Sequence, residues 1–486
     1  MKSVAHASKD LNRSQQEPLL CGPDKQMKMT MLTQNRSTPQ TPAGGQTKPR
    51  RLPPMAATWA CVAALGLWGS FSPALAEDEF EMAPLNYSQT KPRDAAADLE
   101  LRLKQNPNLL AAKTDKEFVI ALLRELNVPV ESQMLVFSKT SLQRGRISPD
   151  TPRAIYFNEQ SYVGWVPGGE AEIMSFDPQL GATFYLVPKA HFHDRPVLVR
   201  DGECLSCHAG SRTRGVPAPL VRSVFTDRQG EAILSAGSFS ISHQNPLSER
   251  WGGWYVTGRH GSERHMGNMT AVEKAGNAIL DREAGANLLN LDRFFQTSDY
   301  PRPGSDIVAL MVFEHQVGLQ QRLLQANQSA RIAIHRYESL MRELKEPMGD
   351  TLAGSALSVV RHQAEKLLEE MLFVTEAPLT GGGVEGDSTF TTVFQKSARR
   401  DSQGRSLRDL DLKTRLFRFR MSYLIYSPHF DGLPTPLRDR FWERLWALLN
   451  EERSPEPFDL LRTGEKQDIK EILLATKPGL PSYWKR

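Results

Sequence analysis

The stretch Cys204-Leu205-Ser206-Cys207-His208 lies in a part of the chain with strand-like hydrophobic patterns, ahead of a part with helical ones. Short apolar runs precede it and indicate β-strands, whereas beyond residue 305 apolar residues recur at helical spacing. The stretch itself reads C-x-x-C-H, the sequence requirement for attaching a c-type haem. Two thiols three positions apart can add to the two vinyl groups of one porphyrin, and the adjacent imidazole can ligate the iron. The sequence therefore predicts one covalent haem c, with Cys204 and Cys207 as anchors and His208 as the proximal iron ligand.

Three other interpretations of the cysteine pair stay open at this point. The pair can be a redox dithiol, although such a dithiol opens the helix of a βα unit, which the preceding segment supports only weakly. It can be half of a zinc site completed by His191 and His193, but this leaves His208 unexplained. A disulfide between Cys204 and Cys207 would be strained and would close too small a loop to stabilise the chain much.

The composition is that of a globular protein without a nucleic-acid footprint. The 486 residues suffice for two or three domains, and 40% of them are hydrophobic, which is enough for sizeable cores. The formal net charge of +4 comes from residues 1–76, which hold nine Lys and Arg but three Asp and Glu. The remaining residues hold 51 basic and 53 acidic side chains, so no basic surface for nucleic acid is expected.

An N-terminal export signal is predicted. A basic segment at residues 48–51 precedes an apolar, uncharged run at residues 55–71, and Pro73-Ala74-Leu75-Ala76 follows with the small-x-small pattern of a cleavage site. The run is shorter than the ~20 residues of a comfortable bilayer-spanning helix, so we expect cleavage and a periplasmic protein. The alternative is a retained anchor, and only in that case is membrane association expected.

The cysteine distribution agrees with export. Two of the four cysteines, Cys21 and Cys61, lie in the part that cleavage removes, so Cys204 and Cys207 are the thiols of the expected mature chain. An exported chain of this length without other cysteines is not built on disulfides. The two remaining thiols therefore reach an oxidising compartment with the spacing required for haem attachment.

The patterns predict an α+β fold: a small antiparallel β region, a haem-binding loop-rich segment and a C-terminal helical region. Strands are expected at residues 134–137, 154–157, 162–166, 172–176 and 183–187, and a further hairpin at 222–225 and 232–235. Helices are expected from Thr114-Asp115 to residue 126, from Ser305-Asp306 onward, and over residues 356–373, 437–449 and 466–474. Residues 77–107 are expected to be extended or partly ordered, 235–268 to be a Gly-rich loop tract and 396–408 to be a solvated loop.

Four segments follow from these expectations. Residues 1–76 hold a polar extension and the secretion signal, and residues 77–131 a linker and a helix. Residues 132–300 form the β-rich segment with the haem site, and residues 301–486 the mainly helical region.

The sixth coordination position of the iron decides between an electron carrier and a catalyst. Met266 lies 58 residues after His208 in the Gly-rich tract, and a thioether ligand raises the reduction potential. We take Met266 as the candidate, with His265 beside it and His315 on the expected long helix as rivals.

Three arginines follow the motif: Arg212, Arg214 and Arg222. A guanidinium group binds a carboxylate in a two-pronged geometry, so these residues can hold the haem propionates. The alternative is that they are ordinary surface charges.

The motif behind an export signal resembles the c-type cytochromes, in which such residues are the thioether anchors and the proximal ligand. The sequence around the motif is similar to large bacterial cytochrome c-domain proteins with one haem motif. The similarity rests on residues 162–166, 251–258, 265–268 and 422–427. The resemblance implies a monohaem cytochrome that carries single electrons between periplasmic redox proteins. A haem enzyme with an open sixth position, acting on peroxide or a small oxidisable substrate, is the rival. A haem-stabilised binding module without a redox role is the third interpretation.

Overall fold

Residues 78–274, 277–347, 349 and 352–485 are described by the computed structural model. They belong to one compact unit of the chain, Ser72–Arg486. The predicted secretion signal and the polar extension before it lie outside the described residues. Within the described part of the chain, no helix combines the length and the apolar character that crossing a bilayer requires.

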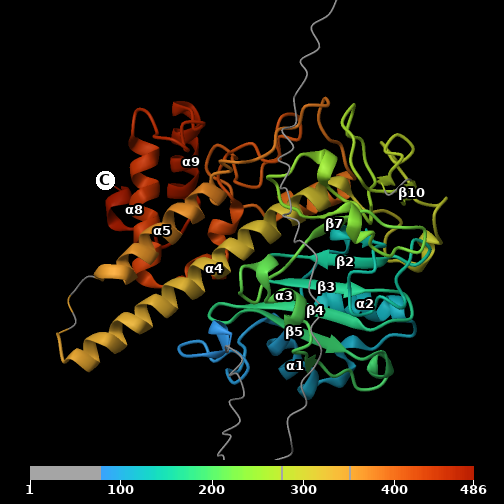
Figure 1. Ribbon diagram of the computed structural model, residues 1–486, viewed down its shortest axis with the longest axis horizontal. Helices are drawn as coiled ribbons and strands as arrows, with labels where there is room; N and C mark the ends of the chain where they lie inside the picture. The colour runs from blue at the N-terminus through green and yellow to red at the C-terminus, as the bar shows by residue number, and fades with distance from the viewer. Residues whose placement is uncertain (1–77, 275–276, 348, 350–351, 486) are drawn as a thin grey trace, which may run out of the picture. The chain divides into compact units, whose positions relative to one another are not determined.

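A seven-stranded antiparallel sheet precedes the long helices in the chain (Figure 1). Its strand order is β6-β5-β4-β3-β2-β1-β9. The strands of this sheet are β1 (Met134–Val136), β2 (Arg153–Phe157), β3 (Ser161–Trp165), β4 (Ala171–Asp177), β5 (Gly181–Val187), β6 (Val199–Arg200) and β9 (Trp254–Tyr255). Two smaller pairs join β7 (Arg222–Val224) to β8 (Ser238–Ser240) and β10 (Val272–Lys274) to β11 (Asn277–Ile279).

Strands β1 to β5 lie where the apolar runs predict them. Local turn chemistry fixes their connections: the side-chain oxygen of Asn158 accepts hydrogen bonds from the N–H groups of Gln160 and Ser161, both at 2.8 Å, between β2 and β3. The α+β class is confirmed. The sheet is larger than expected, because Trp254 and Tyr255 of the Gly-rich tract form β9 and pair with β1.

The two faces of the sheet pack against different parts of the chain, because side chains alternate along a strand. On one face, Tyr156, Val163 and Trp165 are buried in a core shared with α1 (Ala95–Gln105) and α2 (Asp115–Glu125). On the other face, side chains of β3, β5 and β9 join a core that continues into the helical region.

The C-terminal region is helical, as predicted. Its helices are α4 (Ile307–Leu344), α5 (Gly354–Met371), α6 (Ser388–Lys396), α7 (Pro428–Asp431), α8 (Thr435–Asn450) and α9 (Thr463–Thr476). Asp306 caps α4, since its carboxylate accepts a hydrogen bond from the N–H of Ala309 at 2.8 Å. α4 packs against α5, and α5 packs against α8. One core holds Phe313 of α4 together with Tyr162 and Trp254 of the sheet.

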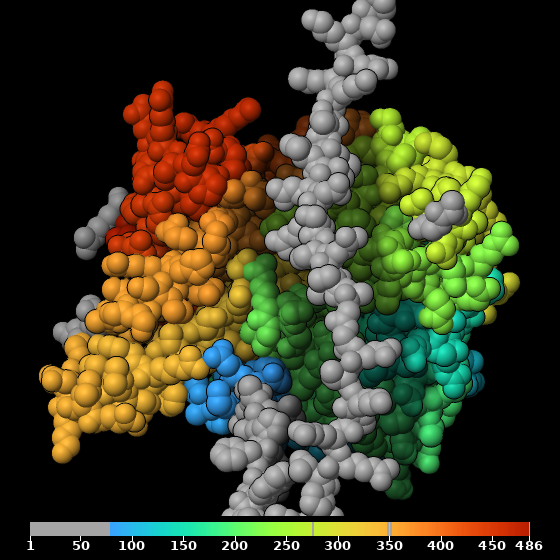
Figure 2. All heavy atoms as spheres, viewed as in Figure 1, coloured from blue at the N-terminus to red at the C-terminus, as the bar shows by residue number. Residues whose placement is uncertain are grey.

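The first described residues pack against α4 and the C-x-x-C-H segment. Phe80, Leu85 and Tyr87 form a small core with Leu180 and Ile332, against which Leu205 and Ala209 also pack. In Figure 2 this segment, coloured blue, lies against the gold end of α4. The motif is therefore supported from outside the sheet as well as by it.

Helix α1 was not expected, because residues 77–107 read as extended. The carboxylate of Asp94 accepts hydrogen bonds from the N–H groups of Ala96 and Ala97, at 2.8 and 2.9 Å. Ala96, Leu99 and Leu103 bury the inner face of the helix. This cap and this narrow apolar face outweigh the polar composition of the segment.

One further expectation is wrong. The partner of β7 is β8 rather than residues 232–235, which make one isolated bridge before the chain turns at Leu234. Residues 397–408 form a loop as expected, and residues 396–404 are mostly exposed. Arg405 ties this loop to α9 through ion pairs with Asp468 and Glu471.

Candidate functional site

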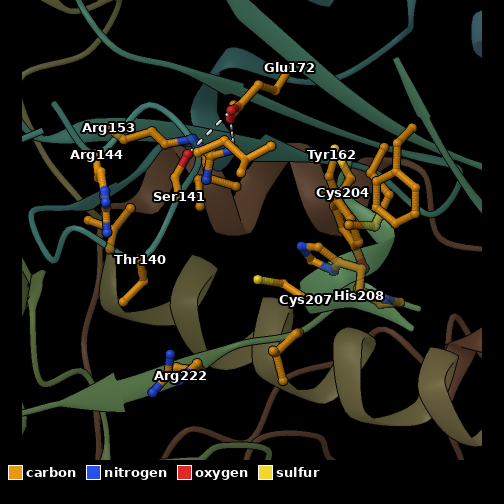
Figure 3. A pocket seen from close by; sticks show the side chains of 18 of the residues that line it. Thr140, Ser141, Arg144, Arg153, Tyr162, Glu172, Cys204, Cys207, His208 and Arg222 are labelled. Carbon is orange, nitrogen blue, oxygen red and sulfur yellow. Dashed lines mark hydrogen bonds and ion pairs between the residues drawn. The ribbon is translucent and has the colours of Figure 1, made fainter. Parts of the chain in front are cut away.

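The C-x-x-C-H stretch forms a single helical turn, α3 (Leu205–His208). The carbonyl of Cys204 accepts hydrogen bonds from the N–H groups of Cys207 and His208, at 3.2 and 3.0 Å. Residues three and four positions apart on a helix lie on the same side of it. Both thiols and the imidazole therefore face the same space, and Figure 3 shows Cys207 and His208 at the edge of one hollow.

The ring of His208 is held in one tautomer. Its Nδ1 atom lies 2.9 Å from the carbonyl oxygen of Ala218, which can only accept, so Nδ1 carries the proton and Nε2 keeps its lone pair. The ring also packs on Phe184, with 5.1 Å between centroids. Burial lowers the pKa of His208 and keeps the ring neutral. A neutral imidazole with one N–H bound to a carbonyl is the form that ligates metals.

The two thiols are free and differ in their surroundings: Cys204 is half-buried and Cys207 is exposed. Burial raises the pKa of Cys204 to about 12, and the carboxylate of Asp201, 3.8 Å from its sulfur, adds to the effect. A reactive redox dithiol needs a thiolate at neutral pH, which requires a lowered pKa. The surroundings of Cys204 act in the opposite direction, so Cys204 is poorly suited to that role.

The hollow beside α3 is a cavity of about 890 Å³, which is in the range of small-molecule and cofactor sites. Its apolar walls come from two parts of the fold. Phe313 belongs to α4, and the other side chains belong to the sheet: Ile155, Tyr162, Met174, Phe184 and Trp254. The loop after β1 closes another side. The cavity thus joins the sheet, the motif and the first turns of α4.

Charged side chains around the cavity carry a surplus of two positive charges. Five basic residues line it, against three acidic ones; they are Lys139, Arg144, Arg153, Arg212 and Arg222, and Glu172, Glu203 and Glu231. Lys139 pairs with Glu231 at 3.1 Å, and Arg153 pairs with Glu172. The surplus therefore comes from Arg144, Arg212 and Arg222, whose three charges are offset in part by Glu203.

Two of the three predicted arginines line this cavity. Arg212 and Arg222 do, and Arg222 donates a hydrogen bond to the hydroxyl of Ser238 at 2.8 Å. Burial, and then the neighbouring Arg212, lower the pKa of Arg222. Arg214 is not among the lining residues and bonds Gln325 at 3.1 Å. Arg144 was missed, because it lies far from the motif in sequence.

A polar cluster on the sheet was also missed. Arg153 of β2 and Glu172 of β4 form an ion pair across Gly164 of β3, and the hydroxyl of Ser141 donates to the second carboxylate oxygen at 3.3 Å (Figure 3). The Nε atom of Arg153 is buried and has no hydrogen-bond partner in the described structure. The charges of this pair act on the pKa of His208, so the pair lies within electrostatic reach of that ring. A charged residue at an inward strand position is the signal that sequence reading could have used.

The three candidates for the sixth iron ligand lie elsewhere. Met266 is 1% exposed, and its sulfur lies 3.6 Å from the hydroxyl of Ser223. His265 accepts a hydrogen bond from the N–H of Gly267 at 2.9 Å, and His315 lies 2.8 Å from the hydroxyl of Ser422. None of the three is among the described residues that line the cavity, so the structure does not bring them to His208.

The zinc interpretation loses its second half. His193 lies 3.1 Å from the carbonyl of Ala112 and 3.1 Å from the carboxylate of Asp115, and His191 is exposed. Across the part of the chain that the structure describes, no group of three or more His, Cys, Asp or Glu is placed to hold a metal ion. These two histidines are not gathered around the thiols.

Comparison of the chain with family models, with curated proteins and with solved structures finds no match in any of the three. Its function is therefore argued from the cavity and the groups around it.

Proposed function

We propose that the chain is an exported protein that carries one covalent haem c and passes single electrons between periplasmic redox proteins. The observation that carries the proposal is the helical turn that presents Cys204, Cys207 and His208 to one cavity while Ala218 holds Nδ1 of the imidazole. Bound there, the haem would supply an iron that changes oxidation state by one electron.

The residues around the cavity suit this cofactor. Cys204 and Cys207 would form the thioether bonds, and Nε2 of His208 would face the iron. Tyr162, Phe184, Trp254 and Phe313 would exclude water from the macrocycle. The surplus of two positive charges equals the charge of the two propionates, which Arg212 and Arg222 are placed to bind.

Access from outside supports electron transfer rather than storage of the cofactor. Cys207 is exposed, so the edge of a haem bound to it would lie at the cavity mouth. The lining residues Leu142 and Leu234 are 55% and 69% exposed and offer apolar contact to a partner. Periplasmic partners are expected because of the predicted export signal, which lies outside the described residues.

A second candidate function is a haem enzyme with an open sixth position. The pair Arg153–Glu172 lines the cavity and favours this function, because a guanidinium and a neighbouring carboxylate can bind a small peroxide and move its proton.

The test is to produce the full chain in a host equipped for cytochrome c maturation. We expect the processed protein to be red and heavier than the polypeptide by one haem. Cys204→Ser and Cys207→Ser should each remove one thioether bond, whereas Cys21→Ser, in the part that cleavage removes, should change nothing. Colourless protein of unmodified mass, or zinc bound at the thiols, would refute the proposal.

A further inference from the structure

We propose that Met174 of β4 supplies the sixth ligand of the iron that His208 holds. The inference rests on the proposed haem and deepens it, because a filled sixth position makes the protein a carrier rather than an enzyme. It replaces the three candidates that the sequence suggests.

The first argument is the composition of the cavity wall. A sixth protein ligand must face the same space as His208. Among the described residues that line this space, Met174 is the one methionine, and His208 the one histidine. Met266, His265 and His315 are each buried in contacts elsewhere.

The other groups that can ligate a haem iron are already engaged. The hydroxyl of Tyr162 bonds the side chains of Gln316 and Gln320, and burial raises its pKa, so it does not form a phenolate. The hydroxyl of Tyr185 donates to Asp94 at 2.8 Å. The amino group of Lys139 pairs with Glu231. Met174 is left with a free donor atom, since a thioether makes only weak hydrogen bonds.

The second argument is position. Met174 lies directly opposite Phe184 in the β4–β5 ladder and opposite Tyr162 in the β3–β4 ladder, so the three side chains share one face. Phe184 in turn packs on the ring of His208. Neighbouring strands are about 4.8 Å apart, a distance that the unbranched side chain of methionine can span.

The third argument is rigidity. β4 is paired on both sides, with seven residue pairs to β5 and five to β3, whereas Met266 follows a loop. Met174 is half-buried and packs against the main core. Ligands carried on strands are held more accurately than ligands on loops, which favours a constant coordination in both oxidation states.

The experiment compares Met174→Leu with Met266→Leu, the same substitution at the rejected candidate. We expect the reduced wild-type protein and Met266→Leu to keep their visible spectra under carbon monoxide. Met174→Leu should bind the gas and shift its spectrum, and its midpoint potential should fall. Met174→His should again resist the gas, because a second imidazole fills the position, at a lower potential than wild type.

The outcomes separate this inference from the proposal beneath it. If haem is attached and Met174→Leu resists carbon monoxide, or if Met266→Leu binds it, the inference is overturned and the haem proposal stands. If the wild-type protein itself binds the gas, the sixth position is open and the enzyme candidate gains. If no haem is attached to wild-type protein, both fail. Leucine conserves the volume of methionine, and thermal melting checks that each variant is folded.

Discussion

Replacing Gly164 by alanine is expected to break the ion pair on the cavity wall. A Cβ atom at this position would lie 2.1 Å from Nη2 of Arg153, 2.6 Å from its Cζ and 2.8 Å from its Nε. These contacts are far inside the van der Waals limit, so the guanidinium has to leave its place above the strand. Glu172 then loses its partner, and Arg153 moves towards solvent.

The size of the effect follows from opposing contributions. The displaced atoms are the far end of a flexible side chain beside the cavity, so the crowding itself costs little. The side chains of Arg153 and Glu172 are each 19% exposed, so losing their partly buried pair costs about 1 kcal/mol. Alanine in a strand is favoured over glycine by about 0.5–1 kcal/mol, which offsets part of this loss. We expect Gly164→Ala to lower the free energy of unfolding by up to about 1 kcal/mol.

A double-mutant cycle in urea tests the cause. In an Arg153→Ala background the three atoms nearest the new methyl group are absent, because all of them belong to the guanidinium. Gly164→Ala should then be neutral or stabilising by up to about 1 kcal/mol. Equal losses in both backgrounds would show that Arg153 is not what the methyl group displaces, and the account of this wall would be wrong.

Two further outcomes are expected. If the proposed haem is bound, Arg222→Gln should lower its midpoint potential in a potentiometric titration, because a cation near the iron would disfavour the oxidised form. Arg214→Gln, outside the cavity lining, is the control, and equal shifts of the two variants would contradict the assignment. Burial lowers the pKa of His429 from 6.5 to about 4, and the ring packs edge-on against Phe176. The contribution of the neutral His429 ring to the free energy of unfolding is complete above pH 6.5 and is lost as the pH falls towards 4. In urea unfolding, wild type should therefore lose roughly 3 kcal/mol more than His429→Leu over this pH window. Equal losses in the two proteins would refute the argument.

Local signals in the sequence predicted the strands and helices that they specify. Thr114 caps α2 and Asp306 caps α4, as their positions before apolar periodic segments indicate. Strand β9 could not be predicted, because Trp254 and Tyr255 become a strand only through their pairing with β1, more than a hundred residues earlier. α1 was hidden by the polar residues on its outer face.

The candidate site divides in the same way. The spacing of Cys204, Cys207 and His208 within five adjacent residues predicts that they serve one site, but in a loop. The structure instead places them on a helical turn, α3. The acceptor for Nδ1 of His208 is the backbone carbonyl of Ala218. Because every residue has such a carbonyl, the sequence cannot predict this contact. The cluster of Arg153, Glu172 and Ser141 depends on the register between neighbouring strands. The sequence of a single strand does not determine that register.

Strand register also explains how the chain can present Met174 dependably. Residues 172 and 174 share one face of β4, and Ile173 belongs to the core on the opposite face. A slip of one residue would turn every side chain of β4 over. Glu172 would then enter the apolar core against α1 and α2 without Arg153, and burying an unpaired carboxylate is strongly unfavourable. The ion pair across Gly164 therefore helps to fix the alignment that places Met174 at the cavity, so Glu172 would contribute to the proposed iron site without being a ligand.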